Sequence, residues 1–316
     1  MEVKKTIFMG TSQFAVPTLE KLAETKYRHD LCVTQPDRPK GRNRKLQSPI
    51  VKHTADELDI PIIQPENINA ENVIAKLKKI NPDVIIVVAY GGYLKKTIRK
   101  IAKFGAINLH PSLLPKYRGA APINYTLFNG DSATGNTIFK IVAKMDAGPI
   151  LYQNKIEILP EDNYTTLYKK LSQLGAKDIL ETLKKIESDN IQPKQQNESE
   201  ATYTEKIKKK DKLINWNNPA EKIFNQVRGL ALKPGATASL REKRIKILEI
   251  DILKTKSQKE PGTFIKEIKN KGLVVATKDN DILIKKLQPA GKRVMNAYSY
   301  NLGARLQTGE HFANGF

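Results

Sequence analysis

Two polar residues at alternate positions of an apolar stretch, Asn108 and His110, carry side chains that can do chemistry. A histidine whose pKa is close to the usual value of about 6.5 takes up and releases protons around neutral pH. An asparagine amide can donate a hydrogen bond to negative charge that develops on a substrate oxygen. Residues two apart on a strand project from one face, so both groups would reach the same ligand. The pair alone is also compatible with an asparagine that closes a turn and a surface histidine.

The strand that carries this pair, residues 106–110, is one of several short apolar runs that alternate with helical patterns. Residues 84–88 are apolar at every position, which is typical of a strand buried on both faces of a parallel sheet. This alternation predicts an α/β fold with a Rossmann-like, doubly wound sheet. Pro111 ends the strand, so the pair lies at its carboxyl end, where such sheets bind ligands. Further expected strands cover residues 3–9, 31–34, 61–63, 137–142 and 150–158, and expected helices cover 14–22, 50–58, 72–80, 123–129 and 165–186.

The C-terminal third has a different pattern. Residues 189–208 are polar and lack periodicity, so we expect a linker between an N-terminal domain, 1–188, and a C-terminal domain, 209–316. One helix and five short strands in the C-terminal domain fit a small β-barrel, of which an OB-like barrel is one candidate. The helix is expected at 220–228 and the strands at 236–240, 244–252, 262–268, 273–276 and 282–288. We expect Trp216 to be a core or domain-contact residue rather than a base-stacking platform.

The chain is strongly basic, with 54 Lys and Arg against 33 Asp and Glu and a net charge of +21. Residues 209–316 alone hold 22 basic and 10 acidic side chains. Such a surplus favours a polyanionic partner. A second concentration lies in a Pro-rich loop after the second predicted strand, and its basic residues are Arg38, Lys40, Arg42, Arg44 and Lys45. A charge run of this kind is often only a solvated surface, and the sequence leaves that interpretation open.

Several function classes are disfavoured by what the composition lacks. Cys32 is the single cysteine, so an internal disulfide and a cysteine-based zinc cluster are excluded, which fits a reducing compartment. The four histidines are scattered, and we expect no metal. The longest aliphatic run, 84–89, is too short to span a bilayer, and the apolar stretch at 6–9 is too short for a secretory signal. We therefore expect a cytoplasmic protein without membrane contact.

Residues 107–119 resemble the folate-binding and catalytic signature of the 10-formyltetrahydrofolate-dependent formyltransferases. Three other segments resemble the branch of this family that acts on methionyl initiator tRNA. These segments are Phe-Met-Gly-Thr-Ser-Gln-Phe-Ala at 8–15, Pro-Asp-Arg-Pro-Lys-Gly-Arg at 36–42 and Ala-Thr-Tyr-Thr-Glu-Lys-Ile at 201–207. The likeness runs in order over nearly the whole chain. It implies a formyl-transfer enzyme with a Rossmann-like catalytic domain.

The resemblance also implies an active site made of Asn108, His110 and Asp146, and 10-formyltetrahydrofolate as the formyl donor. An amine attacks the formyl carbon, and His110 would take the proton from this amine and return one to the departing folate nitrogen. Asn108 would donate a hydrogen bond to the oxyanion, and Asp146 would orient the imidazole. The residues themselves leave open that Asp146 is a solvated carboxylate in a turn.

Folate contacts are implied by the resemblance at six positions. They are Tyr90, Gly91, Ser112, Leu113, Leu114 and Pro115. The loop 112–115 is equally compatible with a Pro-bounded turn that only packs its two leucines. The neighbouring Arg118 is expected either to pair with a carboxylate or to lie in solvent.

The partner implied by the resemblance is the acceptor arm of methionyl initiator tRNA, bound by a monomeric enzyme. Its expected contacts are Arg38, Lys40, Arg42, Arg44, Lys45, Arg244 and Lys246. The product would be formylmethionyl-tRNA for translation initiation. One alternative is a formyltransferase that acts on a nucleotide-linked amino sugar or another small amine. A second is a non-catalytic RNA-binding protein, against which the presence of Asn108, His110 and Asp146 argues.

Overall fold

The computed structural model describes residues 2–41 and 44–314, and the chain divides into two compact units. Unit 1 comprises Met1–Pro122, Ala133–Glu157 and Tyr168–Thr204, and unit 2 comprises Ile123–Ser132, Ile158–Leu167 and Glu205–Phe316. Unit 2 therefore includes two short segments that precede the expected boundary at 188.

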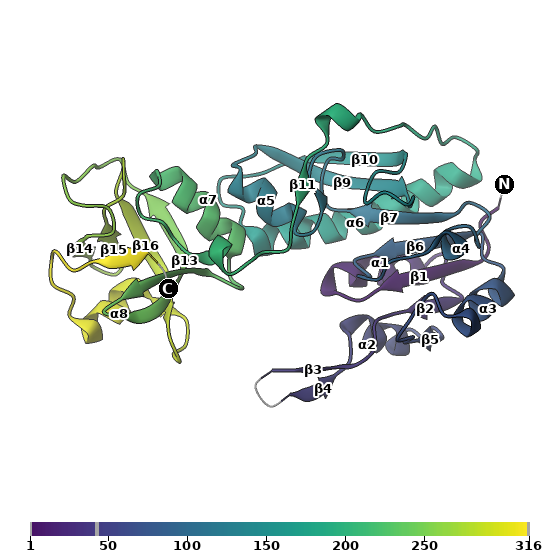
Figure 1. Cartoon of the computed structure of the whole chain (residues 1–316), viewed down its shortest axis with the longest axis horizontal. Coiled ribbons are helices and arrows are strands. Elements are labelled where there is room, and N and C mark those ends of the chain that lie inside the picture. Colours follow the sequence, from purple (N-terminus) through teal and green to yellow (C-terminus); the bar gives the residue numbers. More distant parts are fainter. Residues whose placement is uncertain (1, 42–43, 315–316) are drawn as a thin grey trace. The chain divides into compact units, whose positions relative to one another are not determined.

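Unit 1 is built on a seven-stranded sheet with the order β10-β9-β7-β6-β1-β2-β5 (Figure 1). The five strands from β7 to β5 are parallel, whereas β9 runs antiparallel to β7 and β10 antiparallel to β9. The Rossmann-like α/β class is confirmed, and its antiparallel edge is a feature that the sequence pattern does not predict. The strands are β1 (Thr6–Gly10), β2 (Leu31–Val33), β5 (Ile62–Ile63), β6 (Val84–Val88), β7 (Ala106–His110), β9 (Ala133–Lys140) and β10 (Ile150–Glu157).

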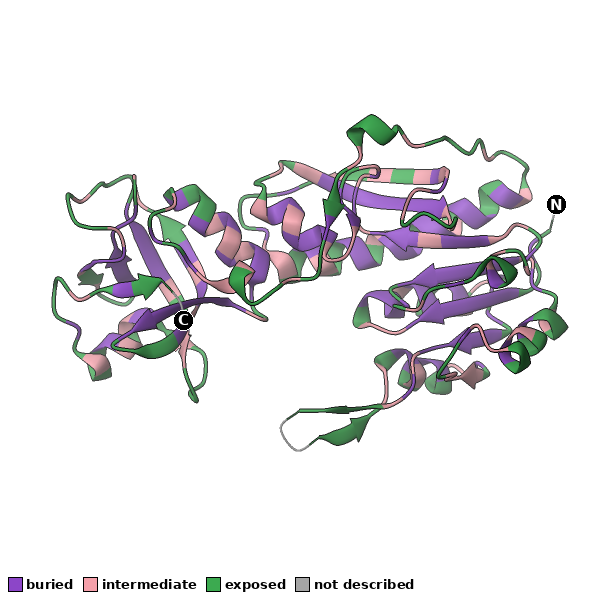
Figure 2. Ribbon diagram, viewed as in Figure 1, coloured by how far each residue is buried: buried purple, intermediate pink, exposed green. Residues whose placement is uncertain are grey.

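Strands β1 and β6 of this sheet are buried along their whole length, and Figure 2 shows the helices with mixed buried and exposed faces. Their side chains are mainly apolar, as expected for strands of a doubly wound sheet that helices cover on both faces. The helices that start in or belong to this part of the chain are η1 (Gln13–Ala15), α1 (Val16–Ala23), α2 (Ile50–Glu57), α3 (Glu71–Ile80), α4 (Lys96–Arg99) and α6 (Tyr164–Glu187).

The strand order reverses between β1 and β6, because the chain runs from β1 outward to β2 and β5 and then returns to β6 on the other side. Crevices at such reversal points bind ligands beyond the carboxyl ends of the strands. The loops that follow β1 and β6 are joined by a 2.9 Å hydrogen bond from the Thr11 hydroxyl to the Tyr90 carbonyl. Strand β7, which carries Asn108 and His110, lies next to β6.

A small hairpin occupies the basic loop, where the sequence predicts no regular structure. Strands β3 (Arg38–Lys40) and β4 (Lys45–Gln47) pair antiparallel. The carboxylate of Asp37 anchors the base of the hairpin and accepts hydrogen bonds from Ser48 at 2.9 Å and from Gln64 at 2.6 Å. Hydrogen bonds from Gln64 and then from Ser48 lower the pKa of Asp37 below its usual value.

The polar segment expected as a linker is tied to unit 1 as far as Thr204. Strand β11 (Tyr203–Thr204) pairs parallel with β8 (Arg118–Gly119), and Lys194 forms an isolated bridge with Ile150. A short turn of helix, η2 (Glu198–Glu200), lies between these contacts. The segment lacks periodicity because it is held by individual hydrogen bonds rather than by an apolar face.

Unit 2 is built on a curled antiparallel sheet with the order β14-β15-β16-β13-β12-β18, with β17 paired to β16. Trp216 is 1% exposed and its ring centroid lies 5.8 Å from that of Phe312, in agreement with the expected core position. The strands are β12 (Ala236–Leu240), β13 (Lys243–Ile252), β14 (Phe264–Ile268), β15 (Gly272–Val275), β16 (Ile282–Pro289), β17 (Met295–Asn296) and β18 (Phe312–Asn314). The helices are α5 (Pro122–Phe128), η3 (Lys210–Lys212), α7 (Ala220–Leu230) and α8 (Ala297–Ala304).

Candidate active site

Asn108 and His110 lie at the carboxyl end of β7, between β6 and β9. Asn108 is in register with Phe139 of β9, and His110 with Thr137. Asn108 is the one half-buried residue of a strand that is otherwise buried. Across residues 2–41 and 44–314, no side-chain hydrogen bond occupies its amide. The amide is therefore able to donate to a ligand.

The imidazole of His110 is 6% exposed and is held from one side by the main chain. Its Nε2 lies 2.8 Å from the carbonyl oxygen of Tyr117. A carbonyl only accepts hydrogen bonds, so Nε2 carries the proton and Nδ1 has the free lone pair in the neutral ring. Nδ1 lies 3.7 Å from Oδ2 of Asp146. The lone pair of Nδ1 in the neutral ring thus faces the Asp146 carboxylate.

Asp146 stands in the turn between β9 and β10, and its side chain is 18% exposed. The main-chain N–H of Gly119 donates a 2.7 Å hydrogen bond to Oδ2, the same oxygen that faces His110. The backbone of Asp146 has a φ of 48°, in the left-handed region that non-glycine residues rarely adopt. The carboxylate is therefore held by a main-chain hydrogen bond and is largely removed from solvent.

The loop that follows β7 is fixed by hydrogen bonds through a single threonine of β9. The hydroxyl of Thr137 donates to the Ser112 carbonyl at 2.7 Å and accepts from the Leu114 N–H at 3.1 Å. The Ser112 hydroxyl donates to the Lys116 carbonyl at 2.7 Å. Ser112 and Leu114 are buried and support the loop, whereas Leu113 and Pro115 are half-buried and can touch a ligand.

The two other residues with an expected folate contact lie in the loop after β6. Tyr90 is 2% exposed, and burial raises its pKa to about 12. Its ring is part of the apolar core, and its carbonyl holds Thr11. Gly91 has a φ of +81°, which a residue with a side chain would adopt only with strain. Gly91 is thus placed to present its main chain at the reversal point, while Tyr90 supports it.

Arg118 is fully buried and paired, which resolves the two interpretations that the sequence leaves open. Its guanidinium donates to both carboxylate oxygens of Glu198 at 2.9 and 3.0 Å, to the amide oxygen of Gln196 and to the Tyr203 hydroxyl. Hydrogen bonds from Arg118 and then from Lys144 lower the pKa of Glu198 to about 2. Sequence reasoning misses Gln196 and Glu198, because both lie in the polar segment without periodicity.

The basic residues of the hairpin that the structure describes are exposed, and Arg38 forms an ion pair. Arg38 pairs with Glu66 at 2.6 Å, whereas Lys40 and Lys45 face each other across the two strands. Arg42, also an expected contact, lies outside the described residues.

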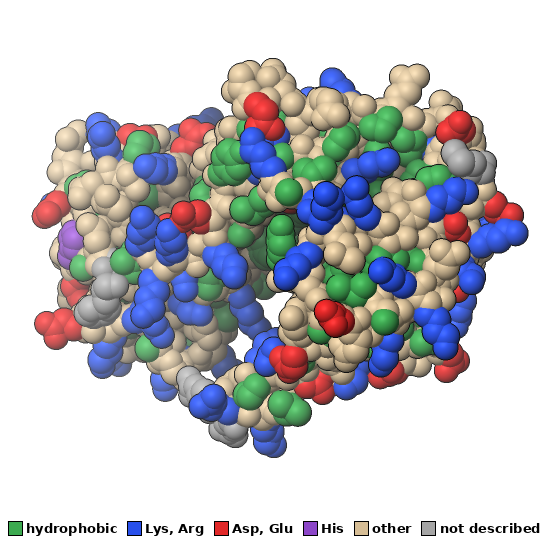
Figure 3. Space-filling model, turned by 45° about the vertical axis from the view of Figure 1, so that its right-hand side comes forward, with side chains coloured by type: hydrophobic (Ala, Val, Ile, Leu, Met, Phe, Trp, Pro, Cys, Tyr) green, Lys and Arg blue, Asp and Glu red, His purple; other side chains and the backbone are tan. Residues whose placement is uncertain are grey.

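On unit 2, Arg244 and Lys246 belong to a group of four cations that we call the cation cluster. Burial, followed by the charges of Arg244, Lys212 and Lys233, lowers the pKa of Lys246. In the part of the chain that the structure describes, none of the four has an acidic partner within ion-pair distance. Lys285 and Lys286, in contrast, pair with Glu249 at 2.9 and 2.6 Å. Lys and Arg side chains are also numerous on the face drawn in Figure 3.

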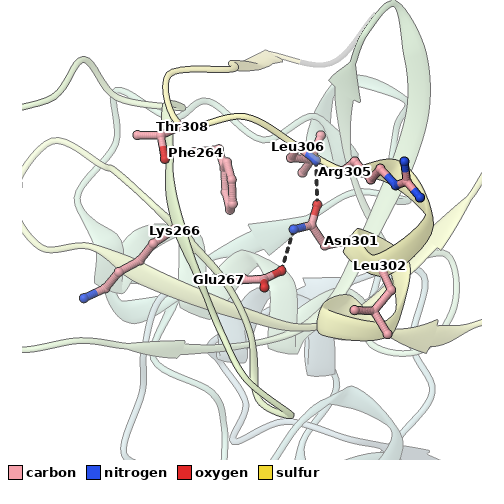
Figure 4. Close-up of a pocket in the computed structure, with 8 residues that line it drawn as sticks. All are labelled: Phe264, Lys266, Glu267, Asn301, Leu302, Arg305, Leu306 and Thr308. Atoms are coloured by element: carbon pink, nitrogen blue, oxygen red, sulfur yellow. Dashed lines mark hydrogen bonds between the residues drawn. The ribbon is translucent and has the colours of Figure 1, made fainter.

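A separate pocket of about 470 Å³ lies in unit 2 and is lined by none of the residues expected to contact folate or tRNA or to take part in catalysis (Figure 4). Its asparagine is used by the fold, because Asn301 donates to Glu267 at 2.6 Å and accepts from the Leu306 N–H at 2.8 Å. The pocket is lined by Phe264, Lys266, Glu267, Asn301, Leu302, Arg305, Leu306 and Thr308.

Within residues 2–41 and 44–314, no group of three or more His, Cys, Asp or Glu side chains is arranged to hold a metal ion. Over the same residues, no helix is long and apolar enough to cross a membrane.

Comparison with known proteins identifies the class to which this fold and site belong. The formyl transferase family model matches residues 4–183, and the formyl transferase C-terminal domain model matches residues 206–305. The protein is a formyl transferase. The methionyl-tRNA formyltransferase of Thermodesulfovibrio yellowstonii is 46% identical over 303 residues, 96% of this chain and 97% of that protein. That of Bacillus velezensis is 41% identical over 307 residues, 97% and 96% of the two chains. The chain belongs to the methionyl-tRNA formyltransferase family.

Solved structures share the fold at low identity. An N-formyltransferase from Helicobacter canadensis, solved with folinic acid and dTDP-3-aminofucose, has a TM-score of 0.65 and 19% identity and covers 91% of this chain and 100% of its own. HypX from Aquifex aeolicus, solved with tetrahydrofolic acid, has a TM-score of 0.62 and 12% identity. The match covers 95% of this chain and 47% of HypX, so this chain spans about half of that protein.

Proposed function

We propose that the protein transfers the formyl group of 10-formyltetrahydrofolate to the amino group of methionyl initiator tRNA. Relatives named methionyl-tRNA formyltransferase align over nearly the whole chain, which supports this formyl-transfer activity. The observation that carries the assignment of the site is the position of His110 between the Tyr117 carbonyl and the Asp146 carboxylate. This arrangement leaves Nδ1 as a base beside a negative charge, on the same strand end as the amide of Asn108.

In the proposed reaction the amine attacks the formyl carbon, and a carbon–nitrogen bond forms as the formyl oxygen becomes an oxyanion. Nδ1 of His110 takes a proton from the attacking nitrogen, and Asp146 stabilises the imidazolium. Asn108 donates a hydrogen bond to the oxyanion, an interaction worth about 3–4 kcal/mol in comparable sites. The bond to the folate nitrogen then breaks, and the same histidine returns the proton to that nitrogen. Atoms and charge balance without a metal or a redox step.

The folate is proposed to lie beyond the carboxyl ends of β1, β6 and β7. Gly91 would present its main chain to it, and Leu113 and Pro115 would form an apolar wall. The buried Tyr90, Ser112 and Leu114 would act by holding these contacts in place. Burial supports this division. The three residues of the first group are exposed or half-buried, whereas the three supporting residues are buried.

The tRNA is proposed to be bound through cations of both units. The acceptor arm would contact the basic hairpin, including Arg38, Lys40, Arg44 and Lys45, and Arg42 by its sequence position. Residues 209–316 would add the cation cluster, whose unpaired charges suit phosphate groups. We propose that the enzyme acts as a monomer in the cytoplasm.

The assignment is tested by incubating the protein with 10-formyltetrahydrofolate and bulk aminoacylated tRNA and identifying which species is formylated. We expect formyl groups on methionyl initiator tRNA. A parallel reaction contains a nucleotide-linked amino sugar, the substrate class of the principal alternative. Formylation of the sugar but not of any tRNA would overturn the proposal.

A further inference from the structure

Gln196, in the polar segment after α6, makes direct hydrogen bonds to the turn that carries Asp146. Its Nε2 donates to the main-chain carbonyl of Asp146 at 2.8 Å and to that of Gly148, also at 2.8 Å. Both hydrogens of the amide are therefore used on one turn. The two residues lie 50 positions apart in the chain, so the contact is a tertiary one.

The other end of the same amide is fixed by a buried cation. Oε1 of Gln196 accepts from Nε and Nη2 of Arg118 at 3.0 and 2.8 Å. Arg118 is 0% exposed and is itself held by Glu198. Only a side-chain amide can donate twice to carbonyls and accept from a guanidinium at the same time. The contacts thus require glutamine by chemistry as well as by size.

The turn has a conformation that needs such support. Asp146 has a φ of 48°, which is unfavourable for a residue with a side chain and persists only where neighbours impose it. At Gly148 a Cβ would collide with the Lys140 carbonyl, so the chain passes very close to β9 there. Gln196 binds the carbonyls on both sides of this stretch. Arg118 also belongs to β8, whose Gly119 binds the Asp146 carboxylate.

We propose that Gln196 is a positioning residue for formyl transfer: it sets the distance between the Asp146 carboxylate and Nδ1 of His110. This inference rests on the proposed function, because it presumes that the carboxylate assists the histidine. Gln196 contacts the turn and not the reacting atoms. Its removal should therefore slow the chemical step without weakening the binding of either substrate, since a small displacement of a catalytic group is costly.

Two near-isosteric variants test this role. Gln196→Met removes all polar contacts, and Gln196→Glu keeps an acceptor for Arg118 but replaces the two donors with an oxygen that repels the carbonyls. We expect each to lower kcat about 10- to 100-fold, with KM for folate and tRNA within about twofold of wild type. The matched control is Gln226→Met, because Gln226 donates to two main-chain carbonyls of unit 2, those of Asp211 and Leu213, at 2.9 Å each. It should retain normal kcat.

The decisive measurement is a double-mutant cycle with Asp146→Asn. If Gln196 acts through Asp146, then Gln196→Glu should cause no further loss of kcat in the Asp146→Asn background. Independent, multiplicative losses, or a kcat for Gln196→Glu within twofold of wild type, would overturn the inference while the proposed function stands. Failure of the wild-type protein to formylate methionyl-tRNA would overturn both. Gln196→Glu keeps the Arg118 contact and serves as the folded variant if Gln196→Met is unstable.

Discussion

The proposed active site of unit 1 and the cation cluster of unit 2 differ in how their side chains are held. His110 is 6% exposed and lies between a carbonyl at 2.8 Å and a carboxylate at 3.7 Å. The four cations of unit 2 are exposed or half-buried and have no acidic partner among the described residues. The proposed active site holds its imidazole in one position, whereas the cation cluster supplies positive charge.

The difference follows from what each task requires. Proton transfer depends on accurate distances between the reacting groups, so the imidazole that carries the proton must be held in place before substrate arrives. Binding to phosphate groups depends on the number of cations and tolerates mobile side chains. Substitutions in the two regions should therefore change different kinetic constants.

The largest expected effect belongs to His110. His110→Ala removes the proposed proton carrier, so kcat should fall by about 100-fold or more, while the dissociation constant for methionyl-tRNA stays within about twofold. Steady-state kinetics and filter binding at one salt concentration measure the two quantities. The matched control is His53→Ala, since His53 is exposed on α2. A His110→Ala enzyme with more than half the normal kcat would disprove the assignment.

Asn108 should behave similarly if its amide stabilises the oxyanion. Asn108→Ala is expected to lower kcat by about 100-fold through loss of the donor. Asn108→Asp has nearly the same shape but only accepts hydrogen bonds, so it should be at least as slow at neutral pH. Comparison of the two variants in the same assay separates donation from packing. Normal turnover by Asn108→Asp would argue that the amide merely fills space.

Removal of the cation cluster should weaken tRNA binding and leave the rate of the chemical step nearly unchanged. Replacement of its four residues by Gln is expected to weaken methionyl-tRNA binding about 10- to 100-fold and to reduce the salt slope by about one unit for each phosphate that is no longer neutralised. The folate KM should not change. The residues replaced are Lys212, Lys233, Arg244 and Lys246.

The matched control for this variant carries four exposed lysines of unit 1 as Gln and has the same net charge. Affinity for tRNA measured at two salt concentrations distinguishes local contacts from total charge. Equal decreases in affinity in the two variants would show that only net charge matters. The control lysines are Lys76, Lys78, Lys79 and Lys103.

The smallest expected effect is a loss of stability of unit 1 in acid. Burial lowers the pKa of His29 from its usual 6.5 to about 3. The unfolded chain binds a proton below pH 6.5 and the folded chain does not, so the contribution to stability is present above pH 6.5 and is lost as pH falls toward 3. Between these two pH values the free energy of unfolding should change by about 1.4 kcal/mol per pH unit.

Urea unfolding at pH 7.5 and pH 5 measures this loss. The difference in unfolding free energy between the two pH values should shrink in His29→Gln and stay unchanged in His311→Gln, since His311 is exposed on unit 2. An unchanged pH dependence in His29→Gln would show that His29 does not drive the acid response.

Local patterns predict much of the fold and part of the site. The strand at 84–88 and the strand at 106–110 are found at the predicted positions, because a fully apolar run and a terminal proline are strong signals. The two-residue spacing also predicts that Asn108 and His110 share a strand end. Their roles and that of Asp146 stay predictions, although the structure brings His110 and Asp146 within 3.7 Å.

Other features could not be predicted, because they depend on contacts between distant residues. Residues 189–204 carry no periodic signal, yet Gln196 and Glu198 hold the turn at 146 and Arg118. The hairpin in the basic loop is set by Asp37 and Gln64, 27 positions apart. The antiparallel strand β9 likewise gives no local sign of its direction. Hydrogen bonds of this kind leave no pattern in neighbouring residues.

The division between a fixed catalytic site and a charged binding surface is tested most directly by measuring the single-turnover rate of formyl transfer at saturating methionyl-tRNA and 10-formyltetrahydrofolate. The cation-cluster variant should recover to within about twofold of the wild-type rate, because saturation compensates for weak binding. His110→Ala should remain slower by about 100-fold or more, since saturation does not replace a proton carrier. A cation-cluster variant that stays slow at saturation, or a His110→Ala enzyme that recovers, would contradict this account.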